Sequence, residues 1–480
     1  MNIKEKNGRL IYITEINNAS SIVLTEKPIF DNESLKLQKI EVEGAEPYYL
    51  QSTFSKVHYK DDTVYNFPFL FEQDQTPWVD GNLFLWSLLH KAKPIEFKAL
   101  NKAASNLLEY KIFVDNSPLH LLDFDSRRPA QRISYIYFSH LLQSNVRGGT
   151  LNQKTAIVFE FYKWLCKQPA INLDINRVDK TTDAFLSFQK NDKTYQTKKV
   201  KVRSQTVKTF TSPVKTGYVR DEGEDLRPLQ AEQLEQLRNA LKDGNYSITE
   251  RLIFDLALDT GARKQTILTI RMKHLLQFVD SNLQRNGTYR LHCGPSTGID
   301  TKFSTPLQID VPKKLADRLK TYAYSEISIA KRLKFKKKHG NIISDDDMYL
   351  FLSNQANPFF MAKDDPRYRK LKTPPEGVYM QMVVKKLFEK SLTLNFPKGF
   401  TFHWCRATFA LRYYQFLLPA VEKGLIKSGE DIITMVQKRM GHVNRETTEN
   451  YLKLFTSSDE QLEAQERYEE RMFPSIDISE

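Results

Sequence analysis

The spacing of apolar side chains divides the chain into a strand-like beginning and two long helical blocks. Up to about Asp74, short apolar stretches such as Leu10–Ile13 and Ser21–Leu24 are separated by polar turns, which is typical of strands mixed with irregular structure. From about Gln75 to Ile171 the apolar period becomes helical. Two stripes carry this period: Phe97, Leu100, Ala104, Leu107 and Leu108, then Leu151, Thr155, Val158, Tyr162 and Leu165. They predict a small helical domain.

The second helical block starts near Leu226, and one of its helices has clear end signals. Ser247 and Glu250 are spaced as a capping box, and an apolar stripe follows them. Gly261 is the predicted C-terminal stop of that helix, which puts Arg263 just beyond it. Farther on, two β-compatible runs between Tyr289 and Val311 predict a hairpin or small sheet, in which Lys302 is the only lysine.

A basic segment connects the two helical blocks. Lys198–Lys215 contains six cations and no acid, namely Lys198, Lys199, Lys201, Arg203, Lys208 and Lys215. Its apolar content is too low to fold alone, so we interpret it as a linker whose cations are candidate DNA-binding residues. A solvated connector is the alternative, and the basic run Lys331–Lys338 has the same two interpretations.

The predicted divisions are 1–74, an accessory region; 75–190, a helical domain; 191–225, the linker; 226–455, a second domain; and 456–480, an acidic tail.

Composition adds the expected partner and surroundings. The chain of 480 residues exceeds what one core usually organises, and its net charge of +13 favours a polyanionic partner such as nucleic acid. No apolar run approaches the roughly 20 residues that cross a bilayer, so we expect a cytoplasmic protein without membrane contact. Cys166, Cys293 and Cys405 are scattered, which is typical of reduced core thiols rather than of disulfides or a metal site.

Four short segments carry the candidate chemistry. They are TGARKQTILTIR around Arg263, DTKFSTPLQIDV around Lys302, FTFHWCRATFA around His403 and Arg406, and MGHVNRETTENYL with His442 and Tyr451. The order Arg, Lys, His-x-x-Arg, Gly-His, and then Tyr nine residues later resembles the active-site signature of the tyrosine recombinase family, also called the phage integrase family. The similarity covers about Leu226–Phe455, and the preceding helical region is similar in style to that family's core-binding domain.

The resemblance implies a mainly α fold with a small β element, closing around duplex DNA as a C-shaped clamp. It also implies strand cleavage without metal or cofactor through a 3′-phosphotyrosyl link. Arg263 and Arg406 suit the anionic phosphodiester because guanidinium forks stay charged and grip two oxygens. His403, three residues before Arg406, and His442 would bind the same phosphate, and the nine-residue register from His442 selects Tyr451 as nucleophile. By resemblance, Lys302 is the general acid.

The sequence departs from the family pattern at one supporting position, and other classes of protein remain open. The family usually has an acid three residues after the first arginine, where this chain has Thr266.

A type IB topoisomerase or telomere resolvase would use similar chemistry without partner exchange. A catalytically silent DNA-binding relative is a further alternative. A metal hydrolase built on His403, Cys405 and His442 lacks a matching carboxylate pair.

The two ends of the chain predict protein contacts. Residues 1–74 exceed the needs of a compact recombinase, so we expect them to bind DNA or a neighbouring protomer, as in a mobile-element integrase of a prokaryote or phage. The tail from Thr456 carries eight acids against two arginines. It is therefore expected to pack on a neighbouring protomer, and the resemblance implies a homotetramer on paired double-stranded DNA sites. Accessory DNA-bending proteins are further expected partners.

Overall fold

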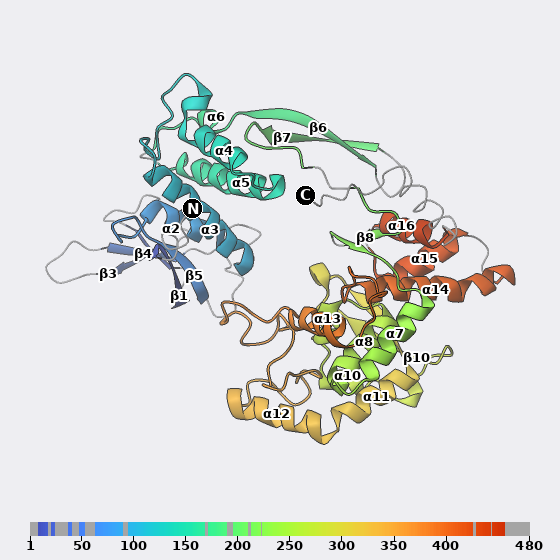
Figure 1. The fold of residues 1–480 in the computed structure, drawn as a ribbon. Coiled ribbons are helices and arrows are strands. Elements are labelled where there is room, and N and C mark those ends of the chain that lie inside the picture. Colours follow the sequence, from blue (N-terminus) through green and yellow to red (C-terminus); the bar gives the residue numbers. More distant parts are fainter. Residues whose placement is uncertain are drawn as a thin grey trace. The chain divides into compact units, whose positions relative to one another are not determined.

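The computed structural model describes most of the chain in two compact units, Met1–Thr211 and Ser212–Glu480. The described residues are 8–17, 21–24, 37–40, 48–52, 63–89, 95–168, 171–189, 195–209, 213–221, 223–425, 429–442 and 444–456. Both units are mainly helical with small antiparallel sheets, so the predicted fold class is confirmed (Figure 1). The clamp around DNA stays a prediction.

The first unit combines a helical core with short sheets. Its helices are α2 (Val79–Leu89), α3 (Phe97–Asp115), α4 (Ile133–Gln143), α5 (Gly148–Leu165) and the single turn α6 (Ile175–Val178). Its first strands are β1 (Leu10–Ile16), β2 (Ser21–Leu24), β3 (Leu37–Ile40), β4 (Tyr48–Ser52) and β5 (Val64–Leu70). β1 pairs with β5, and β4 lies between β2 and β3.

The two predicted apolar stripes form the core of this unit. Every stripe residue of α5 is buried, and so are those of α3 apart from Phe97, which is half-buried. Val64, Phe67 and Leu70 of β5 belong to the same core. The expected boundary after Asp74 therefore does not separate two compact units, because the last strand of the supposed accessory region is buried against the helices.

The prediction that the basic segment is an unstructured linker is wrong for its first residues. β6 (Thr181–Gln189) and β7 (Tyr195–Arg203) form a nine-residue antiparallel ladder, which we call the basic ribbon. The reason is visible in β7, where Val200 and Val202 alternate with lysines at the period of a strand. Net charge and apolar content, from which a linker is predicted, do not reveal this alternation. The boundary between the two units, after Thr211, falls later in the expected linker.

The second unit is built on α8 (Ile248–Thr260). This helix begins with the predicted capping box of Ser247 and Glu250 and ends at Gly261, whose φ of 66° is left-handed. α8 packs against α14 (Trp404–Glu422), α11 (Lys313–Ala323) and β11 (Leu307–Pro312). β11 pairs with β10 (Thr288–Cys293) in the predicted hairpin, with Leu291 opposite Ile309.

The remaining elements enclose this centre. They are β8 (Val219–Asp221), β9 (Glu224–Leu226), α7 (Ala231–Lys242), α9 (Lys264–Leu268), α10 (Met272–Leu275), α12 (Glu326–His339), α13 (Tyr379–Lys390), α15 (Gly429–Met440) and α16 (Arg445–Thr456). α14, α15 and α16 pack on one another, and α16 also packs on β8. The acidic tail beyond residue 456 lies outside the described residues. Within the described part of the chain, no helix has the length and apolar character needed to cross a membrane.

Candidate active site

Arg406 forms hydrogen bonds with three separate segments of the second unit. It lies in the first turn of α14 with only 2% of its surface exposed. Its Nη1 donates to the Gly261 carbonyl at 2.7 Å and its Nη2 to the Met440 carbonyl at 2.6 Å. Its Nε donates to Oδ2 of Asp221 at 3.2 Å. The guanidinium is thus fixed by the end of α8, the end of α15 and β8.

Gly261 is needed where it stands for two reasons. A Cβ atom there would lie 2.3 Å from Cδ1 of Phe409 on α14, and the left-handed φ disfavours other residues. The close approach of α8 and α14 at this point brings the Gly261 carbonyl to Arg406. Arg263 follows two residues later as the N-cap of α9.

Tyr451 lies on α16 and is fully buried. Its hydroxyl donates to Oδ2 of Asp221 at 3.2 Å, the same oxygen that Arg406 contacts. Its ring stacks on His442, with centroids 5.3 Å apart and planes 21° from parallel. Burial and the charge of Asp221 raise the pKa of Tyr451 well above its ordinary value, so the phenol is protonated at neutral pH.

Both predicted histidines present a buried nitrogen that has no hydrogen-bond partner among the described residues. His442 follows Gly441, which has a left-handed φ of 60° just past the end of α15. Its Nδ1 is 2.9 Å from Oγ1 of Thr448, while its Nε2 has no hydrogen bond and lies 3.6 Å from Oδ2 of Asp221. His403, the residue before α14, has Nδ1 3.5 Å from Oε2 of Glu224 and an unpartnered Nε2. Burial lowers the pKa of His442.

Arg263 belongs to the same cluster electrostatically. Its positive charge lowers the pKa of Arg406, His442 and Tyr451, although burial is the larger influence on each. The structure therefore brings together five residues that are spread over almost 190 positions of the sequence, namely Arg263, His403, Arg406, His442 and Tyr451. Two arginines, two imidazoles and a phenol around one point can bind a phosphodiester and attack it.

Lys302 lies on the loop that joins β10 and β11. It is half-buried, and its Nζ is 5.1 Å from the centre of the exposed Phe303 ring. Phe303 and Ser304 both have positive φ, at 56° and 54°, so the loop turns sharply after the lysine. His403, Arg406, His442 and Tyr451 interact with Asp221, whereas Lys302 lies on a surface loop.

The sequence analysis missed Asp221 and Glu224. Asp221 is 6% exposed, and burial alone would raise its pKa. The neighbouring His442 and the charge of Arg406 outweigh burial and hold the pKa of Asp221 well below its usual range. Contact with His403 lowers the pKa of Glu224. The available signal was the acid-rich run DEGED, in a basic chain, at the entrance to the predicted catalytic domain.

Thr266 marks the position where the family usually has an acid. Its hydroxyl is buried and has no hydrogen-bond partner among the residues that the structure describes. The acids that reach the cluster in this chain are Asp221 of β8, which contacts Arg406 and Tyr451, and Glu224 of β9, which contacts His403. Cys405, between His403 and Arg406, is buried, and burial raises its thiol pKa above the ordinary value. Across the described ranges, no group of three or more His, Cys, Asp or Glu residues could hold a metal ion.

The predicted DNA-binding cations have different environments. Lys199 and Lys201 are exposed on β7, although Lys199 also pairs with Asp183 at 2.8 Å. Arg203 is half-buried and donates to the Thr155 carbonyl at 2.8 Å, so it contributes to the first unit's packing. Lys208 and Lys215 are exposed, and the side chain of Lys198 lies outside the described residues.

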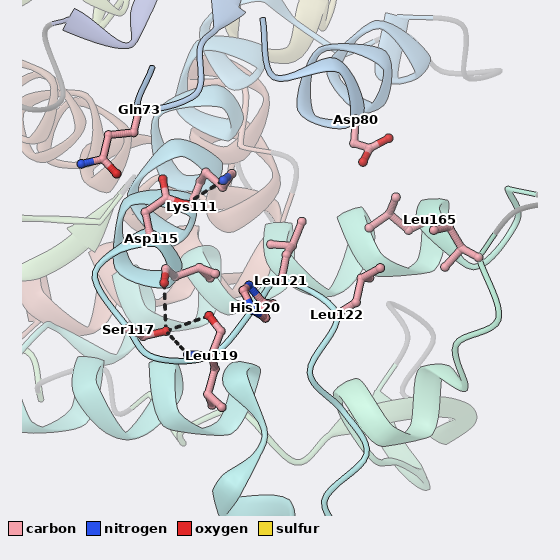
Figure 2. A pocket seen from close by; sticks show the side chains of 12 residues that line it. Gln73, Asp80, Lys111, Asp115, Ser117, Leu119, His120, Leu121, Leu122 and Leu165 are labelled. Carbon is pink, nitrogen blue, oxygen red and sulfur yellow. Dashed lines mark hydrogen bonds and ion pairs between the residues drawn. The ribbon is translucent and has the colours of Figure 1, made fainter. Parts of the chain in front are cut away.

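A surface cavity of about 500 Å³ lies elsewhere, in the first unit. Figure 2 shows leucines of this unit together with Lys111 and Asp115 around it. Lys111 is already neutralised there, because its Nζ lies 2.7 Å from Asp115 and 2.6 Å from Glu72. None of the six predicted catalytic residues lines this cavity.

Comparison with known proteins agrees with the site. Residues 227–457, just under half of the chain, match the model of the phage integrase family, so this segment is a domain of that family of tyrosine site-specific recombinases. No curated protein matches the sequence.

Several solved structures are similar. The Tn1549 transposon integrase in complex with a circular intermediate DNA is 14% identical, with 81% of this chain and 99% of that chain covered and a TM-score of 0.39. A lambda integrase dimer bound to a core site is 12% identical over 75% of this chain and 90% of that one, with a TM-score of 0.34. The catalytic domain of bacteriophage HP1 integrase is 15% identical over 52% and 99%, with a TM-score of 0.26.

Proposed function

We propose that this recombinase cuts and rejoins duplex DNA with Tyr451 as nucleophile, for the integration and excision of a mobile element. The observation that carries the proposal is the meeting of Arg406, Tyr451 and His442 around one carboxylate oxygen of Asp221. A site that gathers a guanidinium, a phenol and an imidazole around one anionic oxygen is suited to a phosphodiester oxygen.

In the reaction, Arg263 and Arg406 neutralise the phosphate, and Nε2 of His403 and of His442 donate to its non-bridging oxygens. Both atoms are buried and make no hydrogen bond to the residues that the structure describes, so a phosphate would satisfy them. The bond between Tyr451 Oη and phosphorus forms, with the phenol proton released to water, while the bond to the 5′ oxygen breaks. Lys302 donates the proton that the 5′ oxygen takes up, which requires the β10–β11 loop to meet the DNA.

A nicked suicide duplex in EDTA tests the roles of Tyr451 and Lys302. Wild-type protein should form a covalent 3′-phosphotyrosyl adduct, and Tyr451→Phe should form none. Lys302→Ala should lower the cleavage rate by roughly 10²–10⁴-fold, the contribution of a positioned general acid. A sulfur in place of the 5′ oxygen should restore the rate, because a thiolate leaves without protonation.

The conservative control is Tyr413→Phe, which changes a tyrosine on α14 outside the proposed set. It should form the adduct at the wild-type rate. An adduct formed by Tyr451→Phe at that rate would remove Tyr451 from the mechanism. A plasmid relaxation assay beside a two-site recombination assay separates the recombinase from a type IB topoisomerase.

The assembly belongs to the proposal as well. We expect a homotetramer on paired sites, with the tail after Phe455 packed on a neighbouring protomer and with DNA-bending proteins assisting. Truncation after Phe455 should leave binding by single protomers nearly intact and reduce synapsis of paired sites, seen by light scattering. Normal synapsis by the truncated protein would contradict this role of the tail.

A further inference from the structure

An acidic hairpin lies on the catalytic cluster. We use this name for Val219–Leu226, which consists of β8, a turn with Gly223 at φ 83°, and β9. Four of its eight residues are acids, Asp221, Glu222, Glu224 and Asp225. Val219 and Leu226 at its base are buried in the core of the unit. The base is therefore anchored, while Asp221 and Glu224 lie beside the turn.

Two acids of the hairpin contact the groups that the proposed reaction assigns to DNA. Oδ2 of Asp221 accepts hydrogen bonds from Arg406 and Tyr451 and is 3.6 Å from Nε2 of His442. Oε2 of Glu224 is 3.5 Å from Nδ1 of His403. A third acid, Asp225, instead pairs with Arg220 across the hairpin at 2.7 and 2.9 Å.

In this arrangement a DNA phosphate cannot reach the nucleophile. Tyr451 is fully buried, and Arg406 and His442 are 2% and 7% exposed. A phosphate bound by the same arginine and histidine would lie within about 4 Å of Asp221, and two buried anions at that distance repel strongly. The carboxylate and the scissile phosphate are therefore alternative occupants of one place.

We propose that the acidic hairpin is an autoinhibitory element in which Asp221 occupies the place of the scissile phosphate until DNA displaces it. The inference rests on the proposed function, because it takes Tyr451 as the nucleophile and Arg406 as a phosphate ligand. The group that competes with DNA for the site is thus an acidic segment of the same chain. Displacement frees Tyr451 from the carboxylate and opens Arg406 to the phosphate.

A permanent supporting role for Asp221 fits the contacts less well. Arg406 is already held by two backbone carbonyls that are independent of Asp221. A supporting acid would leave the nucleophile accessible, whereas Asp221 binds the hydroxyl of a fully buried tyrosine. The hairpin also follows the boundary between the two units by only eight residues. Binding of the first unit to DNA is thus covalently connected to the segment that must move.

The test compares full-length wild-type protein with Asp221→Asn and with Asp221→Asn/Glu224→Gln. The first readout is the initial rate of adduct formation on the nicked duplex. Asparagine keeps the shape and removes the charge, so the rate should rise about tenfold, the factor expected for one charge-assisted hydrogen bond. The double variant should be at least as fast. Glu232→Gln, which removes one exposed acid from α7, is the matched control and should match the wild-type rate.

The second readout does not require cleavage. Nitration of Tyr451 by tetranitromethane, mapped by mass spectrometry, should be slow in wild type and should increase in both variants. If Asp221→Asn lowers the adduct rate at unchanged melting temperature, autoinhibition is overturned and Asp221 supports catalysis. If nitration is as slow in both variants as in wild type, the occlusion is also refuted. If nitration responds but no protein forms an adduct, the hairpin inference stands and the proposed function fails.

Discussion

At the scale of single residues, His274 gives the second unit a defined response to pH. Its Nδ1 accepts from the backbone N–H of Arg271 at 2.9 Å, and its Nε2 donates to the Thr297 carbonyl at 2.9 Å. The bond from the Arg271 N–H requires an unprotonated Nδ1, because a protonated Nδ1 would face that donor. Burial lowers the pKa of His274 below the ordinary value near 6.5.

We expect His274 to make folding less favourable in acid. The unfolded chain takes up a proton near the ordinary histidine pKa, and the folded chain takes it up only at lower pH. The contribution is therefore present above about pH 6.5 and is lost as pH falls through the lowered pKa. Urea unfolding at pH 7.5 and 5.5 should show a smaller loss for His274→Gln than for wild type. An equal loss in both proteins would contradict this assignment.

The residues of the catalytic cluster could be predicted to different extents. Arg263, His403, Arg406, His442 and Tyr451 were found because their motifs are local in sequence and their chemistry suits one substrate. Asp221 was missed because its contact with Tyr451 spans 230 positions. An acid at this position is also contrary to expectation, since a phosphate site is normally lined by cations and hydrogen-bond donors.

At the scale of elements, an ion pair connects the β10–β11 hairpin to the end of α15. Asp310 of β11 pairs with Arg439, whose guanidinium also lies over the Tyr413 ring. Burial and the nearby Arg290 lower the pKa of Arg439 to about 10. Next to this pair, a Cβ atom on Gly441 would lie 2.5 Å from Cδ1 of Leu307. The strand that follows the Lys302 loop therefore packs directly on the segment that carries His442.

Asp310→Asn should weaken both folding and cleavage. It leaves the largely buried Arg439 without its anion, which should reduce the free energy of unfolding by about 1–3 kcal/mol. It should also slow adduct formation, because the hairpin and His442 lose a shared contact. Addition of Arg439→Met should restore part of the stability without restoring the cleavage rate.

The matched control for this pair is Asp280→Asn. Asp280 pairs with Lys313 at 3.0 Å on the exposed surface near the start of α11. Its replacement should change neither stability nor adduct rate appreciably. If the double variant at Asp310 and Arg439 recovers the cleavage rate together with stability, the pair is structural and does not position the hairpin.

Elements with local signals were predictable, and those that depend on distant partners were less so. The capping box of α8, the stripes of α3 and α5 and the β10–β11 hairpin are all confirmed. Each has a sequence signal that is contained in neighbouring residues. β7 was missed although Val200 and Val202 alternate with lysines at the period of a strand, because so basic a segment forms a strand only when β6 pairs with it.

At the scale of the whole molecule, the basic ribbon is the feature that we expect to contact DNA backbone. Lys199 lies opposite Phe185, and Lys201 opposite Asp183, so all four side chains share one face. Phe185 is 69% exposed there. A two-stranded ribbon alone is marginally stable in water, and a ligand along this face would stabilise it.

Lys199→Ala/Lys201→Ala should weaken binding by a similar factor for every duplex sequence. Each lost phosphate contact lowers the slope of log affinity against log salt by about 0.9, so the slope should fall by nearly 2. Fluorescence anisotropy from low to moderate salt measures it. Lys163→Gln/Lys167→Gln on and just after α5 removes the same charge from exposed positions and serves as control. An unchanged slope in the ribbon variant, or an equal fall in the control, would contradict the assignment.

The position of the acidic hairpin has a consequence for dissecting this protein. The segment that matches the family begins at residue 227, one residue after the hairpin ends. A fragment cut at that boundary would keep the arginines, histidines and Tyr451 and would lose their counter-anion. We expect such a fragment to take up sulfate or phosphate from its buffer at the vacated position. DNA binding and cleavage by the fragment would therefore depend on the anions in the buffer, whereas the full chain supplies the anion itself through Asp221.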